Sequence, residues 1–346
     1  MQASGAAVTT SLIAGCTGGD DDDGIPTLTY ASIPGSVVGD HFQRFFSSEQ
    51  IVDQLPNMGE EYEVEFIPSD GSVGVVEAMA AGEAMAGQLA YSSAANAILQ
   101  ERISDGFTIV APMKLITEGW GVKDTYCTWS DSDIETVTDI EGRELAVNSF
   151  GAAIDITARM SLLDAGLDPE EDVSMREIGF GAMAAALEEE RVDVGTFLPD
   201  LYLADRDNLN VIFDNSDSIT NYAQIFYTVR NDVLEENEAV VEMMLEDLWE
   251  GHQWWQNEAS TDDKVDVFEE VSELSEDVIQ PLLDDPEEWE VYGGHDGLAM
   301  EPSAIQDPVD AMEETGFIDE VPDMGDYLDN SYLPSEAQEP PSLGGF

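Results

Sequence analysis

The chain has 346 residues, of which 75 are Asp or Glu and 11 are Lys or Arg, and its formal net charge is -64. Hydrophobic residues make up 43% of it, enough to build the cores of about two domains, which excludes global disorder. Nucleic-acid binding is excluded as well, because there is no basic stripe that could neutralise phosphates.

Residues 1–26 carry the pattern of an export signal followed by a linker. An apolar run over residues 5–14 leads into Ile13-Ala14-Gly15-Cys16, and the acidic run Asp20 to Asp23 follows. The order of these segments resembles a lipobox, in which signal cleavage leaves a lipid-bearing cysteine as the first residue. The apolar run is shorter than the roughly 20 residues that a bilayer span requires. We therefore predict lipidation of Cys16 and a protein tethered to the outer face of the cell membrane.

Strands and helices alternate from Thr27 onward. β-Prone segments bounded by turn residues predict strands at 27–32, 62–67, 84–90 and 107–112. Helices are predicted after the first three of these strands, and the second helix runs from its cap Ser72 to Ala81, with Gly82 ending it. Regular alternation of strand and helix predicts parallel α/β units.

A second set of alternating elements starts near Trp120. Its predicted strands lie at 144–147, 173–178 and 193–198. The helix after the first of these strands places Ile154, Ala158 and Leu162 on one face and ends at Gly166. This repetition predicts a second α/β unit.

The rest of the chain is expected to return to the first unit. From about Val211 the chain is expected to lead back to the first unit through Ala223 to Val229, and a helical, acidic region follows. Beyond Pro334 a tail rich in Pro and Gly is expected to be loose.

Two stretches of the sequence carry a family resemblance. The segments concerned are Glu77 to Ala84 with Gly87 and Tyr91-Ser92-Ser93, and Asp139 to Val147 with Leu163 to Pro169. Their order and spacing resemble the substrate-binding proteins of ABC importers for nitrate, sulfonates, taurine and thiamine-precursor pyrimidines. The segment from Asp310 to Leu333 also resembles the C-terminal ending of that family, so the similarity spans most of residues 27–333.

The resemblance implies an α/β fold, a two-lobed periplasmic-binding-protein clamshell of type II, with the ligand held between the lobes. Lobe 1 would comprise residues 27–115 and 220–333, lobe 2 would comprise residues 119–213, and two crossings would form the hinge. Residues 334–346 would form a tail. Asp164 stands where the family commonly has a lysine, a departure that fits the acidic composition.

The acidic residues are dispersed along the chain, whereas lysine occurs only as Lys114, Lys123 and Lys264. Mutual repulsion of so many carboxylates destabilises a compact state in dilute buffer. At about 1 M salt the Debye length falls to roughly 3 Å, which screens most of that repulsion. The composition therefore predicts a halophilic protein.

Ligands of open α/β sheets bind outside the carboxyl ends of the strands, which selects the turns that follow each predicted strand. Serine and glycine there permit close approach, and helix N-termini attract anions through unsatisfied N–H donors. Aromatic and charged residues near these turns or the hinge are further candidates. The predicted ligand-binding residues are Ser36, Asp70, Ser72, Tyr91, Ser92, Lys114, Trp120, Asn148, Ser149, Gly151, Ala152, Phe180, Asp200 and Tyr222. Capping of helices remains an alternative role for Ser72, Ser92 and Ser149.

The sequence leaves the charge of the ligand open. Lys114 is the nearest cation for an anionic ligand, whereas Tyr91 and Trp120 with serine hydroxyls would suit a neutral or aromatic molecule. The negative field of the chain opposes the capture of anions at low salt, but screening in brine removes that obstacle.

Metal and disulfide chemistry are not predicted. The three histidines, His41, His252 and His295, lie far apart and lack the short spacing of metal ligands, so we expect no metal and no cofactor. If Cys16 carries lipid, Cys127 is the remaining cysteine and no internal disulfide can form.

We predict an extracytoplasmic solute-binding lipoprotein, a monomer that delivers a nitrate-, sulfonate-, taurine- or pyrimidine-like molecule to the transmembrane permease of an ABC importer. A sensor lipoprotein that docks on a signalling partner is an alternative, because it would bind solute in the same way. A pyrimidine-precursor enzyme on the same fold is the other alternative.

Catalysis is not predicted, because no Gly-x-Ser-x-Gly elbow, P-loop or dinucleotide fingerprint occurs. Carboxylate pairs such as Asp70 with Glu77 are expected by chance in so acidic a chain.

Overall fold

The computed structural model describes residues 25–33, 46–69, 71–116, 123–272, 274–284 and 297–340 of the chain. The expectations for Cys16, Ser36, Asp70 and Trp120 lie outside these residues. Within the described ranges, no helix is both long enough and apolar enough to cross a membrane.

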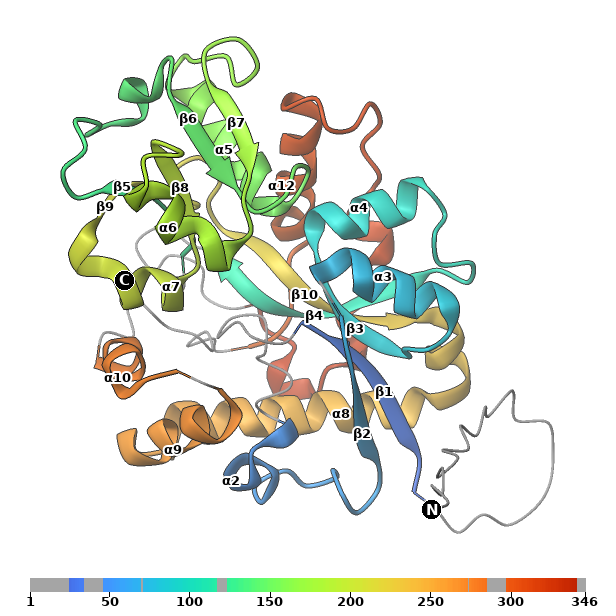
Figure 1. Ribbon diagram of the computed structural model, residues 1–346. Helices are drawn as coiled ribbons and strands as arrows, with labels where there is room; N and C mark the ends of the chain where they lie inside the picture. The colour runs from blue at the N-terminus through green and yellow to red at the C-terminus, as the bar shows by residue number, and fades with distance from the viewer. Residues whose placement is uncertain are drawn as a thin grey trace, which may run out of the picture.

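Two five-stranded sheets form the framework of two lobes (Figure 1). The strands of the first sheet are β1 (Thr27–Ser32), β2 (Glu63–Pro68), β3 (Ala86–Ala90), β4 (Phe107–Ile116) and β10 (Tyr222–Arg230). The strands of the second sheet are β5 (Thr125–Trp129), β6 (Glu144–Val147), β7 (Ser174–Glu177), β8 (Val194–Phe197) and β9 (Leu209–Asp214). The first sheet has the order β2-β1-β3-β10-β4, and the second has the order β7-β6-β8-β5-β9. The same arrangement is therefore built twice.

Each sheet contains one strand that runs against its neighbours. β1 pairs in parallel with β2 and β3, and β10 runs antiparallel to β3 and β4. In the second sheet β6 pairs in parallel with β7 and β8, and β5 runs antiparallel to β8 and β9. β5 and β10 are the first strands after the chain has crossed from the other sheet, so each crossing inserts one reversed strand. The sequence predicted parallel units alone and did not identify β5.

Helices cover both faces of the first sheet (Figure 1). On one face lie α3 (Gly71–Ala81), α4 (Tyr91–Leu99) and α12 (Pro302–Glu314), which contribute buried apolar side chains such as Val75 and Ile305. On the other face lie α2 (Glu49–Val52), α8 (Asn231–Asn257) and α9 (Thr261–Val271), whereas α10 (Glu276–Asp284) packs on α9 and on α7 (Pro199–Asp205) of the second lobe. The hydrophobic core on this face therefore extends to Leu203 in the second lobe.

The close packing of α3 on the sheet depends on Gly87 in β3. A Cβ atom at this position would lie 2.5 Å from Val75 Cγ1 and 3.1 Å from the carbonyl oxygen of Ala31. α3 ends where the sequence predicted, because Gly82 follows it with a φ of +74°, a left-handed conformation that favours glycine.

The second sheet is also covered on both faces. α5 (Ala153–Asp164) buries the predicted apolar face of Ile154, Ala158 and Leu162, whereas α6 (Met183–Glu188) packs on the opposite side near Cys127. α7 (Pro199–Asp205) follows β8. The short 3-10 turns of the molecule, within the described residues, are η1 (Val137–Ile140), η2 (Phe180–Ala182), η3 (Arg206–Asn208), η4 (Met324–Tyr327), η5 (Asn330–Tyr332) and η6 (Ser335–Ala337).

The tail after Pro334 is anchored at Ala337, whereas residues 338–340 are exposed. Ala337 is fully buried in the core of the first lobe. Its carbonyl oxygen accepts hydrogen bonds from the Leu298 N–H at 2.9 Å and the Ala299 N–H at 3.2 Å. The Pro- and Gly-rich composition indicated a loose segment, but backbone hydrogen bonds and one small buried side chain are enough to anchor it.

Candidate ligand-binding site

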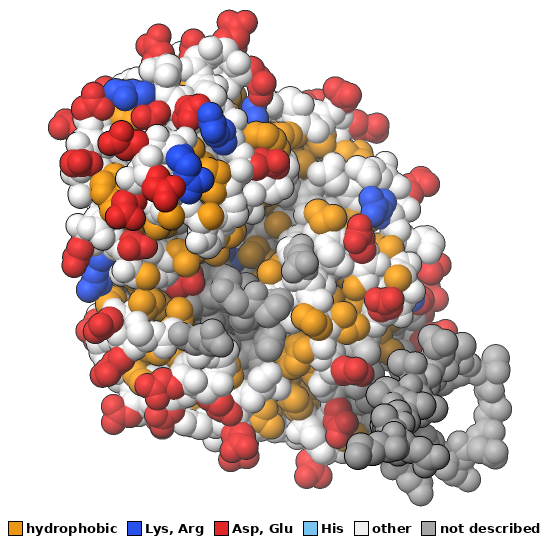
Figure 2. All heavy atoms as spheres, viewed as in Figure 1, with side chains coloured by type: hydrophobic (Ala, Val, Ile, Leu, Met, Phe, Trp, Pro, Cys, Tyr) orange, Lys and Arg blue, Asp and Glu red, His pale blue; other side chains and the backbone are white. Residues whose placement is uncertain are grey.

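A cavity of about 830 Å³ lies between the two lobes. Its wall combines residues near the carboxyl ends of strands in both sheets with the beginnings of α3, α4 and α5. Figure 2 shows hydrophobic side chains around this hollow, and on the outer surface in the same view Asp and Glu side chains are far more frequent than Lys and Arg. The location agrees with the rule that open α/β sheets bind ligands outside the carboxyl ends of their strands.

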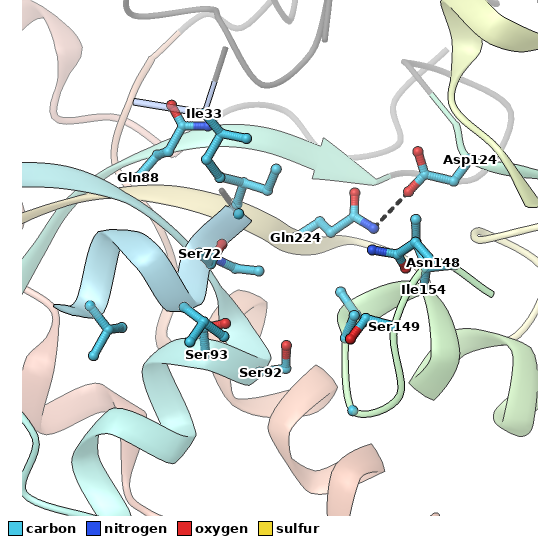
Figure 3. A pocket seen from close by; sticks show the side chains of 18 of the residues that line it. Ile33, Ser72, Gln88, Ser92, Ser93, Asp124, Asn148, Ser149, Ile154 and Gln224 are labelled. Atoms are coloured by element: carbon cyan, nitrogen blue, oxygen red, sulfur yellow. Dashed lines mark hydrogen bonds between the residues drawn. The ribbon is translucent and has the colours of Figure 1, made fainter. Parts of the chain in front are cut away.

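Most of the predicted ligand-binding residues that the structure describes line this cavity. From the first lobe they are Ser72, Ser92 and Lys114, and from the second lobe they are Asn148, Ser149, Gly151, Ala152, Phe180 and Asp200. Ser72, Ser92, Asn148 and Ser149 are among the side chains labelled in Figure 3. Both lobes therefore contribute candidate contacts.

Tyr91 and Tyr222 do not line the cavity, contrary to the prediction. Both are fully buried, and their rings pack edge to face with centroids 5.9 Å apart. The Tyr91 hydroxyl donates to the carbonyl oxygen of Ala153 at 3.3 Å, which joins the first lobe to the start of α5. Burial raises the pKa of both phenols well above the usual range of tyrosine. The two rings therefore form part of the packing between the lobes.

The serines at the cavity are not the expected helix caps. Ser72 lies inside α3, and its Oγ accepts a hydrogen bond from the Ala90 N–H at 3.1 Å, which connects α3 to the end of β3. The N-cap residues of α4 and α5 are Ala90 and Ala152, neither of which caps through its side chain. The hydroxyls of Ser92 and Ser149 therefore do not serve as N-caps of these helices.

Asp124 is the centre of a buried network at the cavity wall. Lys114 Nζ donates to Asp124 Oδ1 at 2.8 Å, and Gln224 Nε2 donates to Asp124 Oδ2 at 2.8 Å. Asn215 Nδ2 donates to the same Oδ2 at 3.2 Å, and Asn215 Oδ1 accepts from the Asp124 N–H at 3.2 Å. Lys114 lies in β4, Gln224 lies in β10, and Asp124 and Asn215 lie beside the two crossings. One carboxylate thus connects both crossings to the first sheet.

The sequence identified Lys114 in this network but missed Asp124, Asn215 and Gln224. It also missed Gln88, a fully buried side chain of β3 that lines the cavity. A signal was present, because Gln88 and Gln224 are polar residues inside otherwise apolar or small-residue strands. Buried polar groups in such positions generally require a hydrogen-bond partner.

The turn before α5 differs from the expectation in its hydrogen bonds. The Phe150 N–H donates to Glu177 Oε1 at 2.7 Å, and the Gly151 N–H donates to Asp155 Oδ2 at 2.9 Å. Burial raises the pKa of Asp155 above its usual value, although the bonds from Gly151 and Arg159 oppose that shift. The N–H groups of this turn were expected to point at a ligand, but the protein's own carboxylates accept two of them.

Reactive and metal-binding groups are sparse in the described part of the chain. No three His, Cys, Asp or Glu side chains there are grouped so that they could hold a metal ion. Cys127 is a free, buried cysteine, and burial raises the pKa of its thiol to about 12. A thiol in that state is a poor nucleophile.

The family model described as NMT1/THI5 like matches residues 59–260 of the chain. No curated protein matches the chain by sequence. Among solved structures, the periplasmic aliphatic sulphonate binding protein SsuA from Escherichia coli is similar with a TM-score of 0.65 and 17% identity, over 93% of this chain and 94% of that one. The family match covers more than half of the residues of the chain.

Two further solved structures extend the comparison. The periplasmic nitrate-binding protein NrtA from Synechocystis PCC 6803 has a TM-score of 0.70 and 11% identity, over 91% of this chain and 89% of that one. A putative periplasmic sulfonate-binding protein SsuA from Methylobacillus flagellatus KT has a TM-score of 0.66 and 18% identity, over 89% of this chain and 92% of that one. At these identities the similarity concerns the fold, and it confirms the predicted two-lobed clamshell of type II.

Proposed function

Because the chain belongs to the NMT1/THI5 like family, we propose that it is an extracytoplasmic solute-binding protein that delivers a small molecule to the permease of an ABC importer. The observation that carries this proposal is the cavity of about 830 Å³ between two lobes joined by two chain crossings. Solved proteins of similar fold are named as sulphonate- and nitrate-binding proteins, which supports a binding role.

The proposed cycle follows from the separate contributions of the two lobes. A ligand that contacts Gln88 and Ser92 of the first lobe together with Asn148 and Ser149 of the second gains all of its hydrogen bonds only when the lobes are close together. Its higher affinity for the closed state is then the free energy that drives closure. The lobes move as rigid bodies, and the few residues at the crossings absorb the change in backbone angles.

The network around Asp124 supports this cycle. It holds both crossings to β4 and β10 through a buried carboxylate, so the angle between the lobes can change while the cavity wall at the hinge keeps its shape. Groups held by several mutual hydrogen bonds resist local distortion better than single contacts do.

The anchoring and the lobe boundaries are further parts of the proposal. We propose that Cys16 carries the lipid, that the lobes comprise residues 27–115 with 220–333 and residues 119–213, and that the protein acts as a monomer in brine. The lipobox-like motif supports lipidation of Cys16, and the acidic composition supports a protein that works in brine. A sensor would use the same cavity and differ in its docking partner, and an enzyme on this fold would consume its ligand.

Retention of a solute followed by closure tests the function. The purified protein is dialysed against a cell extract in high salt, washed and denatured, and the released compounds are identified by mass spectrometry. Small-angle scattering then compares the radius of gyration with and without the retained compound. We expect one retained compound, a smaller radius of gyration in its presence and no loss of the compound over time. Retention of nothing, or conversion of the compound, would contradict the proposal.

A further inference from the structure

We infer that the cavity binds an uncharged molecule that presents both a hydrogen-bond donor and an acceptor, as carboxamides and amino-substituted nitrogen heterocycles do, in preference to nitrate or an alkanesulfonate. The inference rests on the proposed solute-binding function and names its ligand class. Three properties of the cavity wall lead to it: two buried amides, the pairing of its charged groups, and its apolar remainder.

Gln88 supplies the first amide. Its side chain lines the cavity from β3 and is 0% exposed, and neither its amide nitrogen nor its amide oxygen has a hydrogen-bond partner among the described residues. A buried amide without partners is unfavourable, because it has lost its hydrogen bonds to water and gained none in return. In Figure 3 the Gln88 side chain lies beside Ile33. A ligand that accepts at one atom and donates at a neighbouring atom would satisfy both ends of this side chain.

Gln224 fixes the direction of another hydrogen bond. Its Nε2 donates to Asp124 Oδ2 at 2.8 Å, as the dashed line in Figure 3 shows, so the amide cannot be turned over. Its Oε1 is therefore left as an acceptor, and it has no partner in the part of the chain that the structure describes. Nitrate and alkanesulfonates have no hydrogen-bond donor to offer this oxygen, whereas an amide or an amino-substituted ring has one.

The backbone around Gln224 is arranged to present this side chain. The register between β10 and β4 shifts between Ala223 and Ile225, which leaves Gln224 outside the regular ladder. Such irregularities re-aim side chains and occur next to functional sites. Asn148 of the second lobe adds another buried oxygen, Oδ1, without a partner among the described residues. Oxygen acceptors without a hydrogen-bond donor thus come from both lobes: Gln224 Oε1 from the first and Asn148 Oδ1 from the second.

The charged groups of the wall are arranged against an anion. Lys114 is only 5% exposed, and its ammonium is paired with Asp124 at 2.8 Å. Arg102, the other cation among the described lining residues, lies on the exposed rim and is 3.9 Å from Glu77. Asp200 adds a buried carboxyl group to the wall. An anion would therefore find compensated cations and nearby acidic groups.

Two backbone donors of the turn before α5 are also taken, because Glu177 and Asp155 accept the N–H groups of Phe150 and Gly151. These two N–H groups are therefore not available to an anionic ligand. Much of the remaining wall is apolar, with Val76, Ile154 and Leu198. Such a surface suits the body of a ring or a short hydrocarbon chain.

The test compares two sets of probes on the complete protein by titration calorimetry, in about 2 M KCl to screen charge repulsion. The uncharged set is nicotinamide, cytosine and 4-amino-2-methylpyrimidine, and the anionic set is nitrate, methanesulfonate and hexanesulfonate. The variants are Gln88→Leu and its control Gln54→Leu, since Gln54 is exposed and outside the cavity wall.

We expect saturable binding of at least one uncharged probe and none of the anions. Gln88→Leu should weaken that binding roughly 10-fold to 100-fold, because the hydrogen bonds of one amide are lost. The same substitution should raise the melting temperature of the unliganded protein, because it replaces an unpartnered buried amide with an apolar side chain. Gln54→Leu should leave the affinity unchanged. A residue with only a structural role would not combine weaker binding with higher stability.

Two results would overturn the ligand class and leave solute binding intact: tighter binding of nitrate or a sulfonate than of any uncharged probe, or unchanged affinity in Gln88→Leu. Failure of every probe in both sets would also overturn the inference. The retention experiment with a cell extract then decides the proposed function separately, because it does not depend on the choice of probes.

Discussion

Lys114 Nζ lies 2.8 Å from Asp124 Oδ1, and both side chains are almost completely buried beside the point where the chain leaves the first sheet for the second. Gln224 and Asn215 donate to the other oxygen of the same carboxylate. The pair therefore belongs to the cavity wall and to both crossings at once, and its loss should affect stability and ligand binding together.

Removing one partner of this ion pair should be strongly destabilising. Asp124→Leu leaves the Lys114 ammonium buried without its counter-charge, and we expect a loss of about 3–5 kcal/mol in the free energy of unfolding. The double variant Lys114→Met/Asp124→Leu should lose less than the sum of the two single variants, because no isolated charge remains buried. Denaturant unfolding in high salt measures all three values.

An exposed ion pair provides the control. Arg191 Nε lies 2.8 Å from Glu189 Oε2, with side chains 49% and 63% exposed. Arg191→Met should change the free energy of unfolding by less than about 1 kcal/mol. Equal losses in Arg191→Met and Asp124→Leu would contradict the role assigned to the buried pair.

Gly87→Ala should destabilise the first lobe by about 1–3 kcal/mol, because the new Cβ would overlap Val75 and force α3 away from the sheet. Gly179→Ala is the matched control, since a Cβ there would meet no atom within 4 Å and the backbone is not left-handed. Thermal unfolding distinguishes the two variants. A neutral Gly87→Ala would show that α3 can shift without loss of packing.

Asp247 and Asp263 should give the fold opposite pH dependences. Burial raises the pKa of Asp247 above its usual 3.8, although hydrogen bonds from Tyr62 and Asn57 oppose the shift. The folded state then holds the proton more tightly than the unfolded state, so the contribution of Asp247 to stability falls as the pH rises above 3.8. Hydrogen bonds from Ser260 lower the pKa of Asp263, so its contribution is present above 3.8 and disappears as the pH falls.

Each variant lacks one carboxyl group, so the difference in unfolding free energy between wild type and variant reports the pH-dependent contribution of that group alone. For Asp247→Asn this difference should shrink as the pH rises above about 4, whereas for Asp263→Asn it should be constant above about pH 5 and shrink as the pH falls below about 4. Parallel slopes for the two variants would rule out the assigned directions.

The free energy of unfolding of the wild type should rise steeply between about 0.1 M and 2 M KCl, because salt screens the repulsion among the carboxylates of a chain with net charge -64. Sucrose at equal osmolality is the control, since it favours burial without screening charge. Equal stabilisation by sucrose and KCl would show that charge repulsion is not the cause.

Cys16→Ser should release the protein from membranes, because the thiol that carries the proposed lipid is absent. Fractionation of an expressing host after export measures the distribution between membrane and medium, and radiolabelled lipid precursor measures modification directly. Cys127→Ser is the control, since Cys127 is buried in the second lobe and should not influence anchoring. Membrane retention of Cys16→Ser would contradict the proposed anchor.

Local sequence patterns determined much of the fold. The strand at 27–32 and the strand at 144–147 have the bounds that β-propensity indicated, and the helix before Gly82 ends as its left-handed glycine requires. These features depend on residues within one or two turns of each other, so periodicity and turn chemistry are sufficient to predict them. The clamshell itself came from the family resemblance.

Only the tertiary structure decided the direction of β5 and β10 and the identity of the cavity amides. Gln88 and Gln224 lie 136 positions apart in the numbering, and they share the wall because β10 returns to the first sheet after the whole second lobe. Tyr91 and Tyr222 were placed in the wrong environment for the same reason, because burial between lobes depends on which distant surfaces meet. A sequence shows where polar and apolar groups occur along the chain, but long-range packing determines which of them are left without a partner in the space between the lobes.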